Sequence, residues 1–159
     1  MRPLTVPANK ESYWIVDGDI PCTPEEEPSY GYSWNFCANV APIPEACDKM
    51  GKVGVALQYI YIDEKEYDCY VIGKYDASKD DLSYSLMNAM NPSEGIRMTY
   101  PMGERCQLSG TMRSATIDVH CYDTEVEVVS AYATDRCSYH LSMRSYHGCP
   151  KVCVCTTML

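Results

Sequence analysis

The chain has 159 residues, 46% of them hydrophobic, with ten cysteines and a net charge of −9. This length predicts one domain with a core, and so many cysteines are typical of disulfide-bonded proteins from oxidising compartments. The acidic charge argues against nucleic acid as a partner, because phosphate binding requires a basic surface.

The first half of the chain predicts short strands, because apolar and polar residues alternate along it. In the clearest one, Tyr32, Trp34 and Phe36 fall on one face, with polar residues between them. The strands expected in this half cover residues 13–16, 30–37, 53–62, 67–72 and 82–86. Residues 41–47 contain two prolines and are expected to form a loop.

The second half shows the same alternation. Ala115, Ile117 and Val119 share one predicted face, and Thr116, Asp118 and His120 share the other. Further strands are expected at residues 96–100, 113–121, 124–132 and 137–143. No segment has sustained helical spacing. The sequence therefore predicts an all-β fold, a flattened barrel or sandwich of antiparallel strands.

Motifs for metal binding and catalysis are missing. Zinc is disfavoured because there is no Cys-x-x-Cys pair, and the three histidines lack metal-ligand spacing. The sequence contains no Gly-x-Ser-x-Gly, no His-Glu-x-x-His and no phosphate-binding loop. We therefore expect a non-catalytic protein without a metal or a cofactor.

Four cysteine-containing elements in the second half carry a resemblance to a known family. They are Tyr100-Pro-Met-Gly103-Glu-Arg-Cys106, the segment 113–121 beginning with Arg and ending with Cys, Cys137-Ser-Tyr139, and Cys149-Pro150. In order and spacing they resemble the mannose-6-phosphate receptor homology (MRH) domain. The resemblance covers residues 13–150, and implies the same disulfide-stabilised β fold. Residues 1–12 are then an N-terminal arm and residues 151–159 a C-terminal tail.

The resemblance also implies part of the disulfide pairing, which spacing alone leaves open. It implies bridges from Cys106 to Cys137 and from Cys121 to Cys149. Two earlier bridges, Cys22 to Cys37 and Cys47 to Cys69, are expected with them. Cys153 and Cys155 remain, and would pair with each other, with the N-terminal arm around Cys22, or with another chain.

MRH lectins bind mannose through a Gln, an Arg, a Glu and a Tyr. The resemblance assigns the Gln to Gln58, the Arg to Arg113 and the Tyr to Tyr139. A guanidinium and an amide bind adjacent sugar hydroxyls, and a carboxylate accepts hydrogen bonds from them. The position of the Glu is occupied by Ala133. Asp135 lies close by and is included as a candidate ligand of the sugar.

Three functions follow. The first is a non-catalytic secreted or lumenal MRH-like module with a degenerate mannose site, acting through protein contacts or self-assembly. The second is a functional lectin for mannose or mannose 6-phosphate, acting in cargo sorting or glycoprotein quality control. The third is an unrelated secreted, disulfide-rich β domain. The loss of the carboxylate at Ala133 favours the first, and the matches at Arg113 and Tyr139 favour the second.

The two ends of the chain bear on localisation and assembly. Residues 1–7 are followed by no apolar core, so the signal peptide that the cysteines require is expected to be absent from this chain. No run approaches 18 apolar residues, so no membrane span is expected. The tail, residues 151–159, alternates valine with cysteine and is hypothesised to join copies of the chain into a homo-oligomer.

Overall fold

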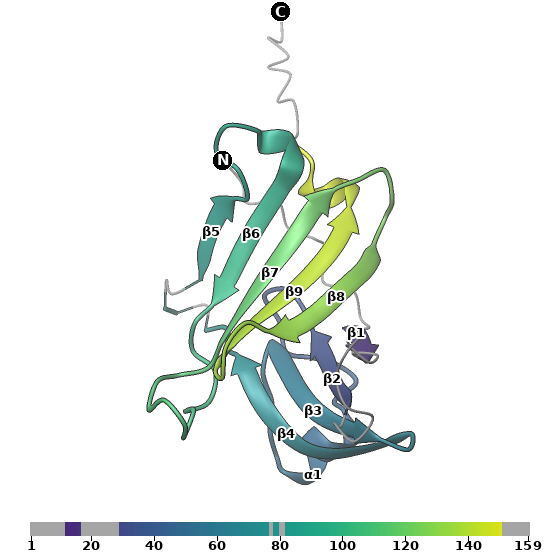
Figure 1. Cartoon of the computed structure of the whole chain (residues 1–159), viewed down its shortest axis with the longest axis vertical. Coiled ribbons are helices and arrows are strands. Elements are labelled where there is room, and N and C mark those ends of the chain that lie inside the picture. The colour runs from purple at the N-terminus through teal and green to yellow at the C-terminus, as the bar shows by residue number, and fades with distance from the viewer. Residues whose placement is uncertain (1–11, 17–28, 77, 80–81, 151–159) are drawn as a thin grey trace, which may run out of the picture.

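The computed structural model describes residues 12–16, 29–76, 78–79 and 82–150. They form two β-sheets that share one core, as in a sandwich (Figure 1). The smaller sheet is antiparallel with the order β1-β2-β3-β4. Its strands are β1 (Tyr13–Val16), β2 (Ser29–Trp34), β3 (Ala56–Ile62) and β4 (Lys65–Gly73). The predicted all-β class is confirmed.

The larger sheet has the order β5-β6-β7-β9-β8. Its strands are β5 (Ser83–Leu86), β6 (Gly95–Tyr100), β7 (Ser114–Cys121), β8 (Glu127–Ala133) and β9 (Ser138–Ser145). The prediction of purely antiparallel strands is wrong at one pair, because β7 and β9 are parallel. β8 does not pair with β7. β9 lies between these two strands, antiparallel to β8 and parallel to β7.

The described residues also contain three short helices. They are the α-helix α1 (Glu45–Lys49) and the 3-10 helices η1 (Pro92–Glu94) and η2 (Tyr146–Gly148). The expectation of a loop over residues 41–47 is wrong for its last part, since α1 begins directly after Pro44. A proline has a fixed φ suited to the entry of a helix. A helix of five residues is too short to show a periodicity in the sequence.

The main core lies between the two sheets. Tyr32 and Trp34 of β2 pack there with the inward faces of β7 and β9, and the Trp34 indole Nε1 donates to the Met143 Sδ at 3.1 Å. The predicted burial of Ile117 and Val119 is confirmed. A smaller cluster on the other face of β3 and β4 packs under α1 and consists of Val40, Ala46, Cys47, Leu57, Tyr59, Cys69 and Val71.

Three of the four expected disulfides are present in the structure. They join Cys47 to Cys69, Cys106 to Cys137, and Cys121 to Cys149. Cys37, expected to pair with Cys22, instead carries an exposed free thiol. Cys22, Cys153 and Cys155 lie outside the described residues, as does the tail for which assembly was hypothesised. Over the described ranges, no helix is both long and apolar enough to cross a membrane.

Candidate functional site

Arg113 is placed by the backbone immediately before β7. Its N–H donates to the Glu104 carbonyl at 2.9 Å, and its carbonyl accepts from the Gly103 N–H at 2.8 Å. A Cβ at position 103 would lie 2.7 Å from the carbonyl oxygens of both Arg113 and Val71. Only glycine therefore allows the three segments to approach so closely. The glycine of the predicted Tyr-x-x-Gly-x-x-Cys element thus fixes the position of the arginine.

The guanidinium of Arg113 lies among aromatic side chains. Its Nη1 donates a hydrogen bond to the Tyr139 hydroxyl on β9. Its Cζ is 4.5 Å from the centroid of the Tyr70 ring and 6.0 Å from that of Tyr139, which permits cation–π attraction. The Nε atom is buried and has no hydrogen-bond partner among the described residues. Burial raises the pKa of the Tyr139 phenol, although the Arg113 charge opposes this, so the hydroxyl is protonated at neutral pH.

Gln58 joins the same group of side chains from β3. Its side chain is almost fully buried, and its Nε2 donates to the Tyr32 hydroxyl at 3.1 Å. The Tyr32 and Tyr139 rings are in edge contact, with centroids 6.5 Å apart, and Gln58 lies opposite Tyr70 in the β3–β4 register. The structure therefore brings together Gln58, Arg113 and Tyr139. We call the five residues Tyr32, Gln58, Tyr70, Arg113 and Tyr139 the Arg113 cluster.

An ion pair borders this cluster. The Lys52 Nζ lies 3.2 Å from the Oε1 and 3.0 Å from the Oε2 of Glu104, and it also donates to the Cys69 carbonyl at 2.6 Å. The same ammonium is 5.4 Å from the centroid of the Tyr70 ring. Both charged side chains are 24% exposed. They line a cavity of about 520 Å³, whose other walls include Val53, Met102 and Met112.

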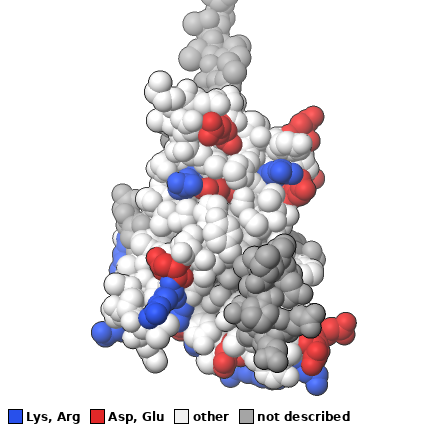
Figure 2. All heavy atoms as spheres, in the orientation of Figure 1, with Lys and Arg blue, Asp and Glu red and all other residues white. Residues whose placement is uncertain are grey.

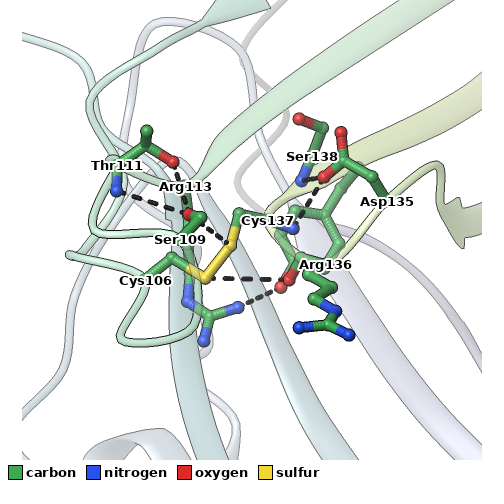
Figure 3. The surroundings of a disulfide bond; sticks show 9 residues. Cys106, Ser109, Thr111, Arg113, Asp135, Arg136, Cys137 and Ser138 are labelled. Atoms are coloured by element: carbon green, nitrogen blue, oxygen red, sulfur yellow. Dashed lines mark hydrogen bonds between the residues drawn. A yellow bond between two sulfur atoms is a disulfide. The ribbon is translucent and has the colours of Figure 1, made fainter.

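The carboxylate of Asp135, a predicted sugar ligand, binds the backbone of its own turn. Its Oδ1 accepts from the backbone N–H groups of Cys137 at 2.8 Å and Ser138 at 2.9 Å. Figure 3 shows this carboxylate directed at its own turn. The bond from Cys137 and the bond from Ser138 lower its pKa. The structure thus does not join Asp135 to the Arg113 cluster. Ala133, opposite Tyr139 in the register of β8 and β9, is exposed and has no polar group there.

A disulfide ties the two halves of the cluster together. Cys106 lies in the loop that leads to Arg113, and Cys137 directly precedes β9, which carries Tyr139 (Figure 3). The Cys137 carbonyl accepts from the N–H of Ser114, the first residue of β7, at 3.1 Å. The cross-link therefore holds the starts of β7 and β9 together, where Arg113 and Tyr139 meet.

A second polar group occupies the opposite face of the larger sheet. Asp118 is 2% exposed and accepts two hydrogen bonds from Arg97, through Nε and Nη2 at 2.7 Å each, and one from the His140 Nε2 at 2.7 Å. Burial alone would raise the pKa of Asp118, but these bonds outweigh it and hold the pKa at about 2. We call Arg97, Asp118 and His140 the Asp118 network.

Charge and metal-ligating groups offer no second candidate. On the face shown in Figure 2, acidic and basic side chains are scattered, with no large patch of one sign among the described residues. Within the described part of the chain, no three side chains of His, Cys, Asp or Glu are placed to hold a metal ion. The Arg113 cluster and the adjoining cavity are therefore the candidate site.

Comparison with known proteins places the chain in a family. A family model described as "Glucosidase II beta subunit-like protein" matches residues 58–159, which is more than half of the sequence. The chain belongs to this family. A search of curated proteins found no match.

One solved structure shows the fold of this glucosidase II beta subunit-like chain. It is the MRH domain of Yos9, solved in complex with alpha3,alpha6-Man5. The match covers 87% of this chain and 76% of the Yos9 chain, with a TM-score of 0.50 at 12% identity. A second match is the MRH domain of glucosidase II beta bound to mannose. It covers 59% of this chain and 84% of the glucosidase II beta chain, with a TM-score of 0.34 at 21% identity. The predicted membership of the MRH family and the MRH-like fold are confirmed.

Sequence reasoning missed four residues at this site: Tyr32 and Tyr70 in the cluster, and Lys52 and Glu104 beside it. Tyr70 could have been found from the β3–β4 hairpin, because an estimated register places it opposite Gln58. Glu104 follows the predicted glycine directly, but its proximity to Arg113 depends on pairing between two loops. No local pattern in the sequence indicates that pairing.

Proposed function

We propose that this chain is a non-catalytic recognition module of the secretory pathway that binds a mannose-type glycan at the Arg113 cluster. The observation that carries the proposal is the state of Arg113. Its guanidinium is fixed between Tyr70 and Tyr139, and its buried Nε has no partner among the described residues. Buried donors are nearly always satisfied, so a donor left over beside a cavity favours a ligand that supplies an acceptor.

A hexose suits these groups chemically. Arginine offers donors in a planar fork, and vicinal hydroxyls of a pyranose offer two acceptors at matching separation. The Tyr139 hydroxyl accepts from Arg113, so its own proton is available to a further acceptor. The Tyr70 ring holds the guanidinium in place, and a fixed donor loses less entropy on binding than a mobile one.

The wider context agrees with a glycan in a lumenal compartment. The MRH domain of Yos9, which is similar in fold, has been solved with a mannose-type ligand, alpha3,alpha6-Man5. Three disulfides among the described residues suit an oxidising compartment such as the lumen of the secretory pathway.

A second function is favoured by one specific observation, the small side chain at position 133. Ala133 lies opposite Tyr139 and contributes no carboxylate, and the Gln58 Nε2 already donates to Tyr32. In this alternative the cluster is a structural remnant, and the domain acts through protein contacts without binding sugar.

The test is the affinity of the full chain for methyl α-mannoside and a short oligomannose, compared between Arg113→Ala and Arg144→Ala. Arg144 is the matched control, because its guanidinium also lies near a tyrosine, 5.1 Å from the Tyr122 centroid, but away from the cluster. We expect Arg113→Ala to weaken binding at least tenfold, about 1.4 kcal/mol, and Arg144→Ala to leave it unchanged. Absence of binding by the unmodified protein would favour the protein-contact alternative.

A further inference from the structure

We infer that Glu104, held in place by Lys52, supplies the carboxylate that accepts hydrogen bonds from the hydroxyls of the bound sugar. This inference rests on the proposed function, because it concerns the same ligand. It identifies a binding residue outside the Gln, Arg and Tyr positions, and it adds the cavity beside the Arg113 cluster to the binding site.

The need for an acceptor follows from the cluster itself. Arginine is only a donor, and the amide acceptor of the cluster, the Gln58 Oε1, is uncharged. Uncharged oxygens bond the hydroxyl protons of a sugar more weakly than a carboxylate does, and a buried hydroxyl proton without a partner weakens binding. A carboxylate is the side chain that accepts such protons most strongly. Ala133 cannot provide one.

The other acids near the cluster and the cavity are committed elsewhere. Asp76 also lines the cavity, but its Oδ1 accepts from the backbone N–H and the hydroxyl of Ser78. Asp135 accepts two backbone N–H groups of its own turn. Asp118 lies on the opposite face of the larger sheet and is bonded to Arg97 and His140. Glu104 has none of these commitments, since Lys52 is the partner that its carboxylate has in the described structure.

Glu104 is adjacent to the cluster through both backbone and charge. Its carbonyl accepts from the Arg113 N–H at 2.9 Å, and its N–H donates to the Val71 carbonyl at 2.7 Å, next to Tyr70 in the chain. Its negative charge is one of the causes that raise the pKa of Tyr139 after burial. The carboxylate is therefore within electrostatic range of the phenol that Arg113 contacts.

Lys52 orients this carboxylate without saturating it. Its ammonium contacts both oxygens and is itself fixed by the carbonyl of Cys69, a residue cross-linked to α1. A carboxylate has about four lone-pair positions, so one ammonium leaves acceptor capacity unused. Because the Glu104 side chain is 24% exposed and lines the cavity, that capacity is accessible to a ligand. Lys52 is a positioning residue in this arrangement.

The cavity indicates how a longer glycan would lie. One hexose contacts Arg113 and Glu104, and the next unit extends into the space of about 520 Å³. Val53, Met102 and Met112 give this space apolar walls that suit the C–H faces of a pyranose. Lys74, Asp76 and Lys79 also line this space and offer polar groups to the sugar hydroxyls, so the ligand class is an oligosaccharide of hexoses rather than a monosaccharide.

The test compares Glu104→Gln with Glu127→Gln in the full chain, with oligomannose as the ligand. Glu127 is the matched control, because it also faces a cation, 3.7 Å from the Arg144 Nη1, but lies away from the cluster. We expect Glu104→Gln to weaken binding at least tenfold and Glu127→Gln to leave it unchanged. Because glutamine keeps the shape of the side chain, thermal unfolding of both variants checks that the fold persists.

A second measurement needs no variant. On titration of the unmodified protein with oligomannose, the 13Cδ resonance of Glu104 should move in step with saturation, while that of Glu127 stays in place. Binding that Arg113→Ala abolishes, but that neither shifts the Glu104 resonance nor responds to Glu104→Gln, would overturn this inference and leave the proposed function standing. A failure of the unmodified protein to bind any oligomannose would overturn both.

Discussion

The larger sheet carries an arginine-containing polar group on each of its two faces, and the groups differ in whether the arginine is paired with a carboxylate among the described residues. In the Asp118 network both carboxylate oxygens accept hydrogen bonds from Arg97 or His140, although the buried Nδ1 of His140 has no partner among the described residues. In the Arg113 cluster the guanidinium has one bond to Tyr139, a buried Nε without a described partner, and a neighbouring cavity.

This difference separates a structural group from a recognition group. An arginine whose donors are bonded to a buried carboxylate stabilises the fold, and little of the hydrogen-bonding capacity of that pair remains for a ligand. An arginine that is held by aromatic rings, but not saturated by acids, keeps donors for an incoming molecule. Residue type alone therefore does not distinguish the two groups, and the presence of a carboxylate partner for the arginine does.

The largest effect is expected from removing the cross-link that borders the Arg113 cluster. The double substitution Cys106→Ser and Cys137→Ser opens a loop with a sequence separation of 31 residues. We expect a loss of roughly 3.5 kcal/mol in the free energy of unfolding, because the unfolded chain gains conformational entropy when the loop is no longer closed. Denaturant unfolding measures the loss. We also expect weaker sugar binding, because the disulfide no longer holds Arg113 and Tyr139 together. Unchanged binding would show that the disulfide is not needed for the binding site.

A smaller effect is expected at the Asp118 network. The folded pKa of Asp118, about 2, lies below its ordinary value of 3.8. A lowered pKa means that ionised Asp118 contributes stability above pH 4, about 2 kcal/mol, which is lost as the pH falls from 4 to 2. Asp118→Asn should remove this part of the pH dependence and leave sugar binding intact.

Urea unfolding at several pH values measures this contribution, with Asp123→Asn, an exposed acid, as the control. If Asp118→Asn retained the full acid-induced loss of stability, the network would not be the source of that loss. If the substitution abolished sugar binding in a folded protein, the two faces would not have the separate tasks that we assign to them.

The sequence predicted most of the strands, because alternation of apolar residues reports directly on which face is buried. The inward faces of β2, β7 and β9 follow the predicted pattern, with Trp34, Ile117 and Leu141 fully buried. The order of strands was less accessible, since insertion of β9 between β7 and β8 depends on pairing between residues far apart in the chain. The helix α1 is too short to leave a periodic signal.

The candidate site was predictable only in part. The resemblance to MRH domains named Gln58, Arg113 and Tyr139, which the structure brings together. Asp135 was named because it is close to the missing carboxylate in sequence, but a short acidic side chain two residues before Cys137 bonds to its own turn. Glu104 was not named, because its place beside Arg113 arises from contact between two loops.

The central claim is that the Arg113 cluster, and not the Asp118 network, is the recognition site. The most direct measurement is a chemical-shift map of the isotopically labelled domain titrated with oligomannose. We predict saturable shifts at Tyr70, Arg113 and Tyr139, with the resonances of Asp118 and His140 unchanged. Shifts confined to the Asp118 network, or no shift anywhere up to the solubility limit of the glycan, would contradict the claim.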